Sequence, residues 1–145
     1  MFGTLYEIES SGGFVTPVPW TFTGGPDGAY PSTPLIQNTN GMIYGTTANG
    51  GSIDDYGVIF RFDNHLGPFV SLVSTSGNTG ATIGILGQNL TGTTAVSFNG
   101  TAATFTVVSG TYMTAQVPSG ATTGTVTVVT PSAMLTSNRP LQVTD

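Results

Sequence analysis

Carboxylates are the main side chains of this 145-residue chain that could do chemistry, and most of them lie in its first half. Two carboxyl groups roughly 5–10 Å apart across a cleft could hydrolyse a glycosidic bond, and the acids of "SIDDYG" at 52–57 could supply oxygen ligands to Ca²⁺. The acids concerned are Glu7, Glu9, Asp27, Asp54, Asp55 and Asp63. No two of them form a recognisable catalytic motif, and the 52–57 segment lacks the regular acid spacing of a calcium loop. Solvated strand faces and an exposed Gly-Asp turn explain these acids more simply.

The other residue types needed for catalysis are almost absent. His65 is the only histidine and stands without a catalytic acid or nucleophile signature beside it, so we expect it to be solvated or to cap a turn. The chain has no cysteine, which removes disulfides, thiol catalysis and cysteine-ligated zinc. We therefore predict that the protein is not an enzyme, and we assign it no catalytic, metal-binding or cofactor-binding residue and no cofactor.

Four aromatic residues of the first half are candidates for contacts with a glycan: Trp20, Tyr30, Tyr44 and Tyr56. An aromatic ring exposed on a β face can stack on a pyranose ring while nearby Asn, Gln and Asp side chains hold hydroxyl groups. The alternative is packing, because a small unit needs large residues for its own core. Both interpretations stay open at this point.

The elements that would carry these residues are β-strands. Gly, Pro, Thr and Val are abundant, and no window shows a sustained apolar period of 3.6 residues. Short alternating runs are instead separated by Gly, Asn, Asp and Pro, which predicts an all-β protein. The expected strands are 4–8, 14–22, 35–38, 42–47 and 58–62 in the first half. In the second half they are 69–73, 81–86, 95–98, 102–108, 112–117, 125–130, and 133–135 taken together with 141–144.

Turn signals separate the strands of the first half. "NTNG" at 38–41 predicts a β-hairpin with a type I′ turn, because Asn and Gly both tolerate positive φ. "GGPDGAYP" at 24–31 and "NGGSIDDYG" at 49–57 predict longer turns.

A Gly-Pro step in "DNHLGPF" at 63–69 marks a domain boundary. We expect a β-rich repeat unit over 1–66 and an immunoglobulin-like β-sandwich over 67–145, because about seven short strands without a helix follow the boundary. The residues expected to face inward in the sandwich are Val70, Leu72, Ile83, Ile85, Val96, Phe98, Phe105, Val107, Val117, Val126, Val128 and Val143.

Three segments of the second half resemble a known family. "GATIGILGQNL" (80–90), "AVSFNGTAATFTVVS" (95–109) and "VPSGATTGTVTVVTPSA" (117–133) look like successive signatures of IPT/TIG domains, and the resemblance covers essentially all of 68–145. It implies an immunoglobulin-like fold that serves as a spacer or adhesive module in bacterial surface proteins and as an accessory domain of polysaccharide-acting enzymes. It implies no catalytic residue.

The first half contains one strand twice. "GTLYEIES" at 3–10 and "GVIFRFDN" at 57–64 agree in chemical class at nearly every position, 57 − 3 = 54 residues apart. Together with "TFTGGPDGAYPSTPLIQNTNGMIYGTTANGGSIDDYGVIFRF" at 21–62, this half resembles one GloVer-type tandem repeat of secreted bacterial proteins plus the start of the next. The resemblance implies a propeller-like antiparallel unit, and a single unit lacks the neighbours that repeats normally need.

Either the chain is cut from a longer array, or other subunits supply the missing neighbours. Strand 57–64 of one subunit could take a place like that of strand 3–10 in the next, a head-to-tail contact that yields a ring or an open filament. The residues expected at such a contact are Thr4, Tyr6, Ile8, Val58, Phe60 and Phe62.

The composition of the chain limits the classes of binding partner. The chain has two Lys+Arg against seven Asp+Glu and a net charge of −5, so it offers no basic patch to nucleic acid or to an anionic membrane. No apolar run reaches the about 18 residues of a membrane span. Residues 1–20 lack the basic start and apolar core of a signal peptide, so we expect a mature fragment or an expressed piece of an exported protein.

These observations predict a non-catalytic structural or adhesive protein at the cell surface or outside the cell. Its expected partners are other protein chains, itself included, met head-to-tail through strand edges. The alternative is a carbohydrate-binding accessory fragment of a secreted polysaccharide-acting enzyme, for which polysaccharide is the partner.

Overall fold

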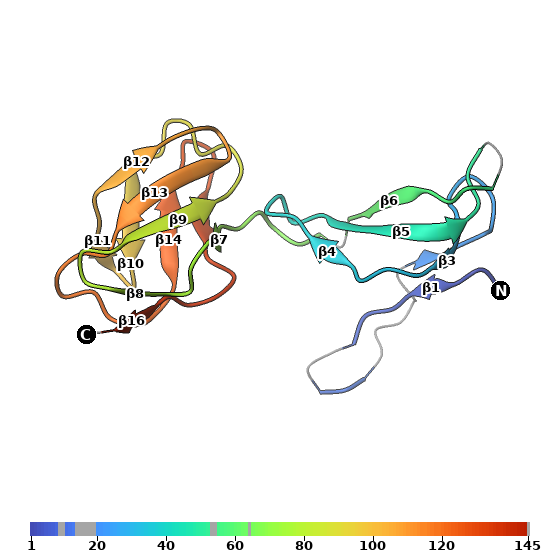
Figure 1. Cartoon of the computed structure of the whole chain (residues 1–145), viewed down its shortest axis with the longest axis horizontal. Coiled ribbons are helices and arrows are strands. Elements are labelled where there is room, and N and C mark those ends of the chain that lie inside the picture. The colour runs from blue at the N-terminus through green and yellow to red at the C-terminus, as the bar shows by residue number, and fades with distance from the viewer. Residues whose placement is uncertain (9–10, 14–19, 53–54, 64, 145) are drawn as a thin grey trace. The chain divides into compact units, whose positions relative to one another are not determined.

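The structure is a computed structural model that divides into two compact units, Met1–Leu66 and Gly67–Asp145. Every regular element among the described residues is a β-strand, which confirms the all-β prediction (Figure 1). The residues that the structure describes are 1–8, 11–13, 20–52, 55–63 and 65–144.

The first unit is built around one long strand, β5 (Ile43–Asn49). β3 (Ala29–Pro31) and β4 (Ile36–Gln37) pair with one edge of β5, and β6 (Ile59–Phe62) pairs with the other edge. β1 (Thr4–Leu5) and β2 (Trp20–Thr21) form a two-stranded antiparallel ribbon. All pairings between these described strands are antiparallel, whereas the propeller-like character of the unit stays a prediction.

The expected strands of this unit are present with different bounds. β1 and β4 are shorter than predicted, and β2 covers only the end of the predicted 14–22 strand, of which residues 14–19 lie outside the described part. β3 lies inside the segment 24–31 that we expected to be a turn. Its backbone pairs with β5 although its three residues show no apolar alternation, which is the signal that strand prediction uses.

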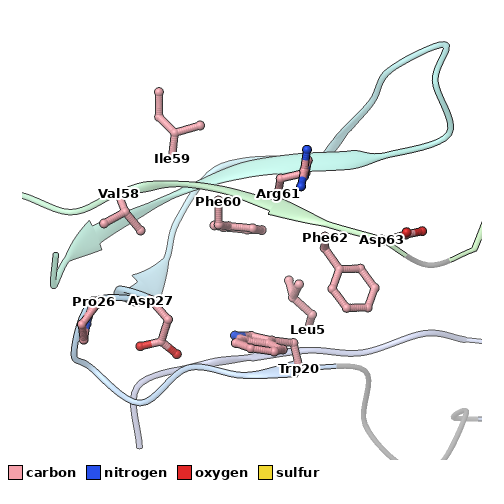
Figure 2. A pocket seen from close by; sticks show the side chains of 10 residues that line it. All are labelled: Leu5, Trp20, Pro26, Asp27, Val58, Ile59, Phe60, Arg61, Phe62 and Asp63. Atoms are coloured by element: carbon pink, nitrogen blue, oxygen red, sulfur yellow. The ribbon is translucent and has the colours of Figure 1, made fainter.

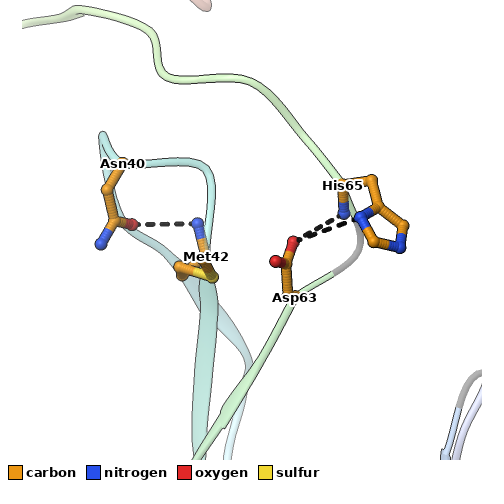
Figure 3. Close-up of polar contacts among 4 residues, drawn as sticks. All are labelled: Asn40, Met42, Asp63 and His65. Carbon is orange, nitrogen blue, oxygen red and sulfur yellow. Dashed lines mark hydrogen bonds and ion pairs between the residues drawn. The ribbon is translucent and has the colours of Figure 1, made fainter.

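The Asn-Gly hairpin is confirmed, but its type I′ turn is wrong. Ile36 pairs with Tyr44 and the Asn38 N–H donates to the Met42 carbonyl at 2.9 Å, so the loop has three residues. Gly41 has φ of +90°, whereas Asn40 is not among the residues with positive φ. The Asn40 side-chain oxygen accepts a hydrogen bond from the Met42 N–H at 2.9 Å, which stabilises this wider loop (Figure 3).

The apolar core of the first unit is small. Among its described residues only Leu5, Phe22 and Ala29 are buried apolar side chains. The Phe22 ring meets the Phe60 ring edge-to-face with centroids 5.0 Å apart. Phe60 packs across Gly45, where a Cβ would lie 2.5 Å from the Phe60 ring, so Gly45 is needed for this contact.

The second unit is a sandwich of two four-stranded antiparallel sheets. One sheet has the order β11-β10-β14-β15, from β11 (Thr101–Ala102), β10 (Ala95–Phe98), β14 (Val126–Val129) and β15 (Met134–Thr136). The other has the order β12-β13-β9-β7, from β12 (Phe105–Val107), β13 (Tyr112–Gln116), β9 (Thr82–Leu86) and β7 (Ser71–Leu72). A short parallel pair is formed by β8 (Ser76–Asn78) and β16 (Gln142–Thr144).

The strand predicted at 102–108 is divided between the two sheets. The Ala103 N–H donates to the Val96 carbonyl in one sheet, and the Thr104 carbonyl accepts from the Gln116 N–H in the other, both at 2.9 Å. The chain therefore crosses from sheet to sheet between Ala103 and Thr104, and one predicted strand becomes β11 and β12.

The core of the sandwich follows the predicted inward face with two kinds of difference. Phe105, Val107 and Val143 are only partly buried, because β12 and β16 lie at sheet edges, and the other nine predicted residues belong to the buried cluster. Five further buried residues were not predicted: Leu90, Met113, Ala115, Leu135 and Leu141.

The second Asn-Gly hairpin has the turn that the first one lacks. Phe98 pairs with Thr101, so Asn99 and Gly100 form a two-residue loop, and their φ values are +44° and +87°. Positive φ at both positions defines a type I′ turn. The Asn99 amide donates to the Thr122 hydroxyl at 2.8 Å and to the Thr123 carbonyl at 3.2 Å, which ties the turn to the neighbouring loop.

Candidate functional site

The carboxylates of the first unit are engaged in their own loops. Asp27 accepts hydrogen bonds from the Thr23 hydroxyl at 2.6 Å and the Thr23 N–H at 2.9 Å, and these bonds lower the pKa of the Asp27 carboxyl. Asp55 accepts from the Gly50 N–H and from the Asn49 amide. Among the described residues, no three acids or histidines come together as metal ligands.

His65 is solvated, which is one of the two alternatives expected from the sequence. Its N–H donates to the Asp63 carboxylate at 2.8 Å, and its ring nitrogen Nδ1 lies 3.9 Å from the same oxygen (Figure 3). Both side chains are exposed. Glu7 is exposed as well, and Glu9 and Asp54 lie outside the described residues.

The four candidate aromatic residues do not form one surface. Trp20 is half-exposed and lines a cavity of about 590 Å³, whereas Tyr44 lines a different cavity of about 420 Å³. The Tyr30 ring meets the Phe2 ring edge-to-face, and Tyr56 is largely exposed. Only Trp20 therefore combines an accessible ring with a hollow that also contains charged groups, and its role in sugar binding stays a prediction.

The larger cavity follows the full length of β6. All six residues from 58 to 63 line it, and successive side chains of a strand point to opposite faces, so the cavity reaches around the outer edge of the strand. The Phe60 and Phe62 rings point across the hollow toward Leu5 and Trp20, whereas Ile59 points away from them (Figure 2).

Charged groups border the same cavity. Arg61 on β6 is the only lysine or arginine of the first unit. Asp27 and Asp63 are the carboxylates of the lining. Arg61 was not among the predicted site residues; its counterpart 54 residues earlier, Glu7, carries the opposite charge.

β6 has one paired edge and one open edge. The Thr47 N–H donates to the Val58 carbonyl at 2.9 Å, so the β6 residues with hydrogen bonds to β5 are Val58, Phe60 and Phe62. The backbone groups of Ile59 and Arg61 point the other way, and within the described residues no strand pairs with them. We call the N–H and C=O groups of Ile59 and Arg61 the open edge of β6.

The six residues predicted to meet another subunit lie on β1, on β6 or next to them. Thr4 pairs with Thr21, and Tyr6 and Ile8 follow β1 as exposed side chains. On β6 and just before it, the members are Val58, Phe60 and Phe62, which are partly buried and point toward the first unit's own interior. Their part in a subunit contact stays a prediction, and the structure adds Ile59, which is 81% exposed.

The second unit presents fewer features of a site. Its hollow of about 150 Å³ is lined by threonines, Gln116, Phe105 and Ala115 and contains no charged residue. Its two sheets enclose a continuous buried core, which makes it an immunoglobulin-like β-sandwich.

Comparison with known families identifies that sandwich further. The IPT/TIG domain family matches residues 68–143, which is just over half of the chain, and the chain belongs to this family. The family consists of non-catalytic immunoglobulin-like domains, as the sequence resemblance implied. The resemblance of the first half to GloVer-type repeats stays a prediction.

One solved structure with a similar part is an auxiliary nutrient binding protein from Bacteroides ovatus ATCC 8483. The two chains are 20% identical with a TM-score of 0.43, and the match covers 52% of this chain and 20% of that one. This chain thus corresponds to about a fifth of that protein's length. No match is found among curated protein sequences. Among the described residues, no helix is long and apolar enough to cross a membrane.

Proposed function

We propose that this chain is a non-catalytic structural module of an exported bacterial protein, and that its first unit associates with further subunits through strand edges. The observation that carries the proposal is the open edge of β6 with the exposed Ile59 on it. A strand edge with unpaired N–H and C=O groups is a template for another strand, and natural proteins usually shorten, charge or cover it.

The distribution of apolar side chains also favours a missing neighbour for the first unit. Among the described residues, three apolar side chains are buried in the first unit and fourteen in the second. Of the fifteen large apolar residues that are exposed in the described part of the chain, eleven belong to the first unit. Large exposed apolar surface commonly marks a protein interface, so the first unit has the composition of a repeat without its neighbours.

The second unit supports the structural part of the proposal. Its core is complete by itself, and membership in the IPT/TIG family implies a spacer, adhesive or accessory role outside the cell. The chain's few charges and its many Thr, Ser, Asn and Gly residues are compatible with an exported protein.

Light scattering of the full chain over a concentration series tests the proposal. We expect a mass above that of one chain that rises with concentration, and a strictly monomeric protein at the highest concentration would overturn the proposal. Arg61→Pro is the informative variant, because the Arg61 N–H points away from β5 and proline removes it without breaking the β5–β6 ladder. Arg61→Ala is the matched control, since it removes the charge and keeps the N–H.

A second candidate function is weak glycan binding, and the half-exposed Trp20 in the charged cavity favours it. Trp20 is the only tryptophan of the chain, so tryptophan fluorescence reports on the surroundings of this one residue. Titration with plant and bacterial polysaccharides should then give a saturable change in a monomeric sample. No response to any polysaccharide would refute this candidate and leave the structural proposal in place.

A further inference from the structure

The two copies of the repeated strand pair through different edges and bury different faces. We compare the β1 segment (residues 2–8) with the β6 segment (residues 56–62), which are related by 56 − 2 = 54 residues. In the sequence, both segments begin with an aromatic residue and a glycine, Phe2-Gly3 and Tyr56-Gly57. In the structure, the two segments pair with neighbouring strands through different residues.

The two segments use opposite edges. In the β1 segment, the Gly3 carbonyl accepts a hydrogen bond from the Phe22 N–H at 3.0 Å, and Leu5 pairs with Trp20, so residues 3 and 5 bond to β2. Adding 54 to these positions gives 57 and 59. Position 59 belongs to the open edge of β6, because the β6 segment bonds to β5 through residues 58, 60 and 62. At position 59, the edge that binds β2 in the β1 segment is therefore unpaired in the β6 segment, whereas the Gly57 N–H donates to the Gly50 carbonyl at 2.9 Å and only the Gly57 carbonyl is left for β2.

The two segments also bury opposite faces. Leu5 is 9% exposed in the β1 segment, whereas its counterpart Ile59 is 81% exposed. Conversely, Tyr6 is 63% exposed, whereas its counterpart Phe60 packs on the ring of Phe22. At each of these two positions, the side chain of one segment is thus more buried than its counterpart in the other segment.

The first residues of the two segments also differ in burial. Phe2 packs on the Tyr30 ring with centroids 6.2 Å apart, and its carbonyl accepts a hydrogen bond from the Tyr30 N–H at 2.6 Å. Its counterpart Tyr56 is 84% exposed. The next position must be glycine, because Gly3 has φ of +106° and a Cβ there would lie 2.4 Å from Pro31 Cδ. The β6 segment supplies a glycine at this position, Gly57.

We propose that the β6 segment of one subunit replaces the β1 segment of a second subunit and pairs with the β2 strand of that subunit. This inference rests on the proposed self-association through β6 and specifies its partner strand and register. Ile59 then lies opposite Trp20 of the partner subunit, and Val58 lies opposite Thr21 of the partner subunit. Tyr56 takes the position of Phe2 against Tyr30 of the partner subunit.

In this exchange, the β6 segment takes the place beside β2 of a segment that resembles it in sequence. Among the described residues, β1 pairs with β2 through Thr4 and Leu5, and the Gly3 carbonyl extends this pairing by accepting from the Phe22 N–H. The Gly57 carbonyl and the backbone groups of Ile59 can offer the same bonds to β2. After the exchange, β6 is paired on both edges and joins the sheets of two subunits. The released β1 segment also gains conformational entropy. Because the contact joins different surfaces of each subunit, it continues as a ring or an open filament.

Disulfide locking tests the exchange. Thr4 and Thr21 form a non-hydrogen-bonded pair, whose Cα atoms in an antiparallel ladder are about 4.5 Å apart, and this spacing suits a disulfide. The chain has no other cysteine. Oxidised Thr4→Cys/Thr21→Cys protein should be at least tenfold weaker in self-association than the same protein after reduction. Equal association in both redox states would overturn the exchange while leaving self-association through β6 intact.

Crosslinking between subunits tests the register. A mixture of the single variants Val58→Cys and Thr21→Cys should give at least tenfold more mixed dimer than a mixture of Ile36→Cys and Thr21→Cys, in which Ile36 is an exposed control on β4. Equal yields in the two mixtures would overturn the register. A wild-type chain that stays monomeric would instead refute the proposed function itself, and the exchange with it.

Discussion

Ile59→Ser is the substitution that should separate self-association from folding most clearly. Burying an isoleucine side chain contributes about 1.5–3 kcal/mol. If position 59 acquires the environment that Leu5 has, its exposed fraction falls from 81% to 9%, a change of 81 − 9 = 72%. The corresponding loss in the variant is about 1–2 kcal/mol per contact, or an about 5- to 30-fold weaker association.

Sedimentation velocity at several concentrations measures this change, and thermal unfolding provides the second readout. Because Ile59 is exposed within its own subunit, the unfolding midpoint should change little at dilutions where both proteins are monomeric. Ile36→Ser is the matched control: Ile36 is 69% exposed on β4 of the same unit and does not belong to the open edge of β6. An Ile36→Ser variant that loses as much association as Ile59→Ser would refute the edge contact and point to the sheet face.

Three further predictions concern the fold. Phe98→Ala should lower the free energy of unfolding by about 3–5 kcal/mol in urea, because Phe98 is fully buried in the sandwich, and an unchanged midpoint would contradict this core. Asn99→Ala, at a positive φ, should destabilise by about 1–3 kcal/mol, and Asn40→Ala, in the wider loop, by less. The folded pKa of Asp27 lies below its ordinary value of 3.8, so the stability contributed by this carboxylate is present above that value and is lost as the pH falls through the folded pKa. An NMR titration of Asp27 should show the lowered midpoint, and Thr23→Val should raise that midpoint.

The sandwich was largely predictable because its inward residues alternate within strands. Val126 and Val128 are examples, and both are buried. Met113 and Ala115 lie on the same face of their strand as Val117, so the pattern already contained the signal for their burial. Leu90 is buried without belonging to a strand, and alternation gives no information about such a position. Leu141 lies two residues before Val143 in the predicted strand 141–144, so alternation already indicated its burial.

The two Asn-Gly steps show that a turn dipeptide alone does not determine the turn type. Asn40-Gly41 and Asn99-Gly100 are the same dipeptide between two strands, and the same local rule predicts a type I′ turn for both. The register of the flanking strands decides between them, since Phe98 pairs with Thr101 across two residues and Asn38 bonds to Met42 across three. Strand register depends on the rest of the sheet, which a turn dipeptide does not contain.

The sequence indicated only part of the candidate site, the open edge of β6. The 54-residue repeat identified the two strands, but it did not indicate that they use opposite edges and opposite faces. One signal was available in "GVIF" at 57–60, where Val58, Ile59 and Phe60 are apolar without alternation. Such a run is typical of a strand covered on both faces, yet the described chain covers only the Phe60 side and leaves Ile59 exposed. The strand is therefore suited to an interior position that one subunit does not provide, and the most economical source of the missing cover is the sheet of another subunit.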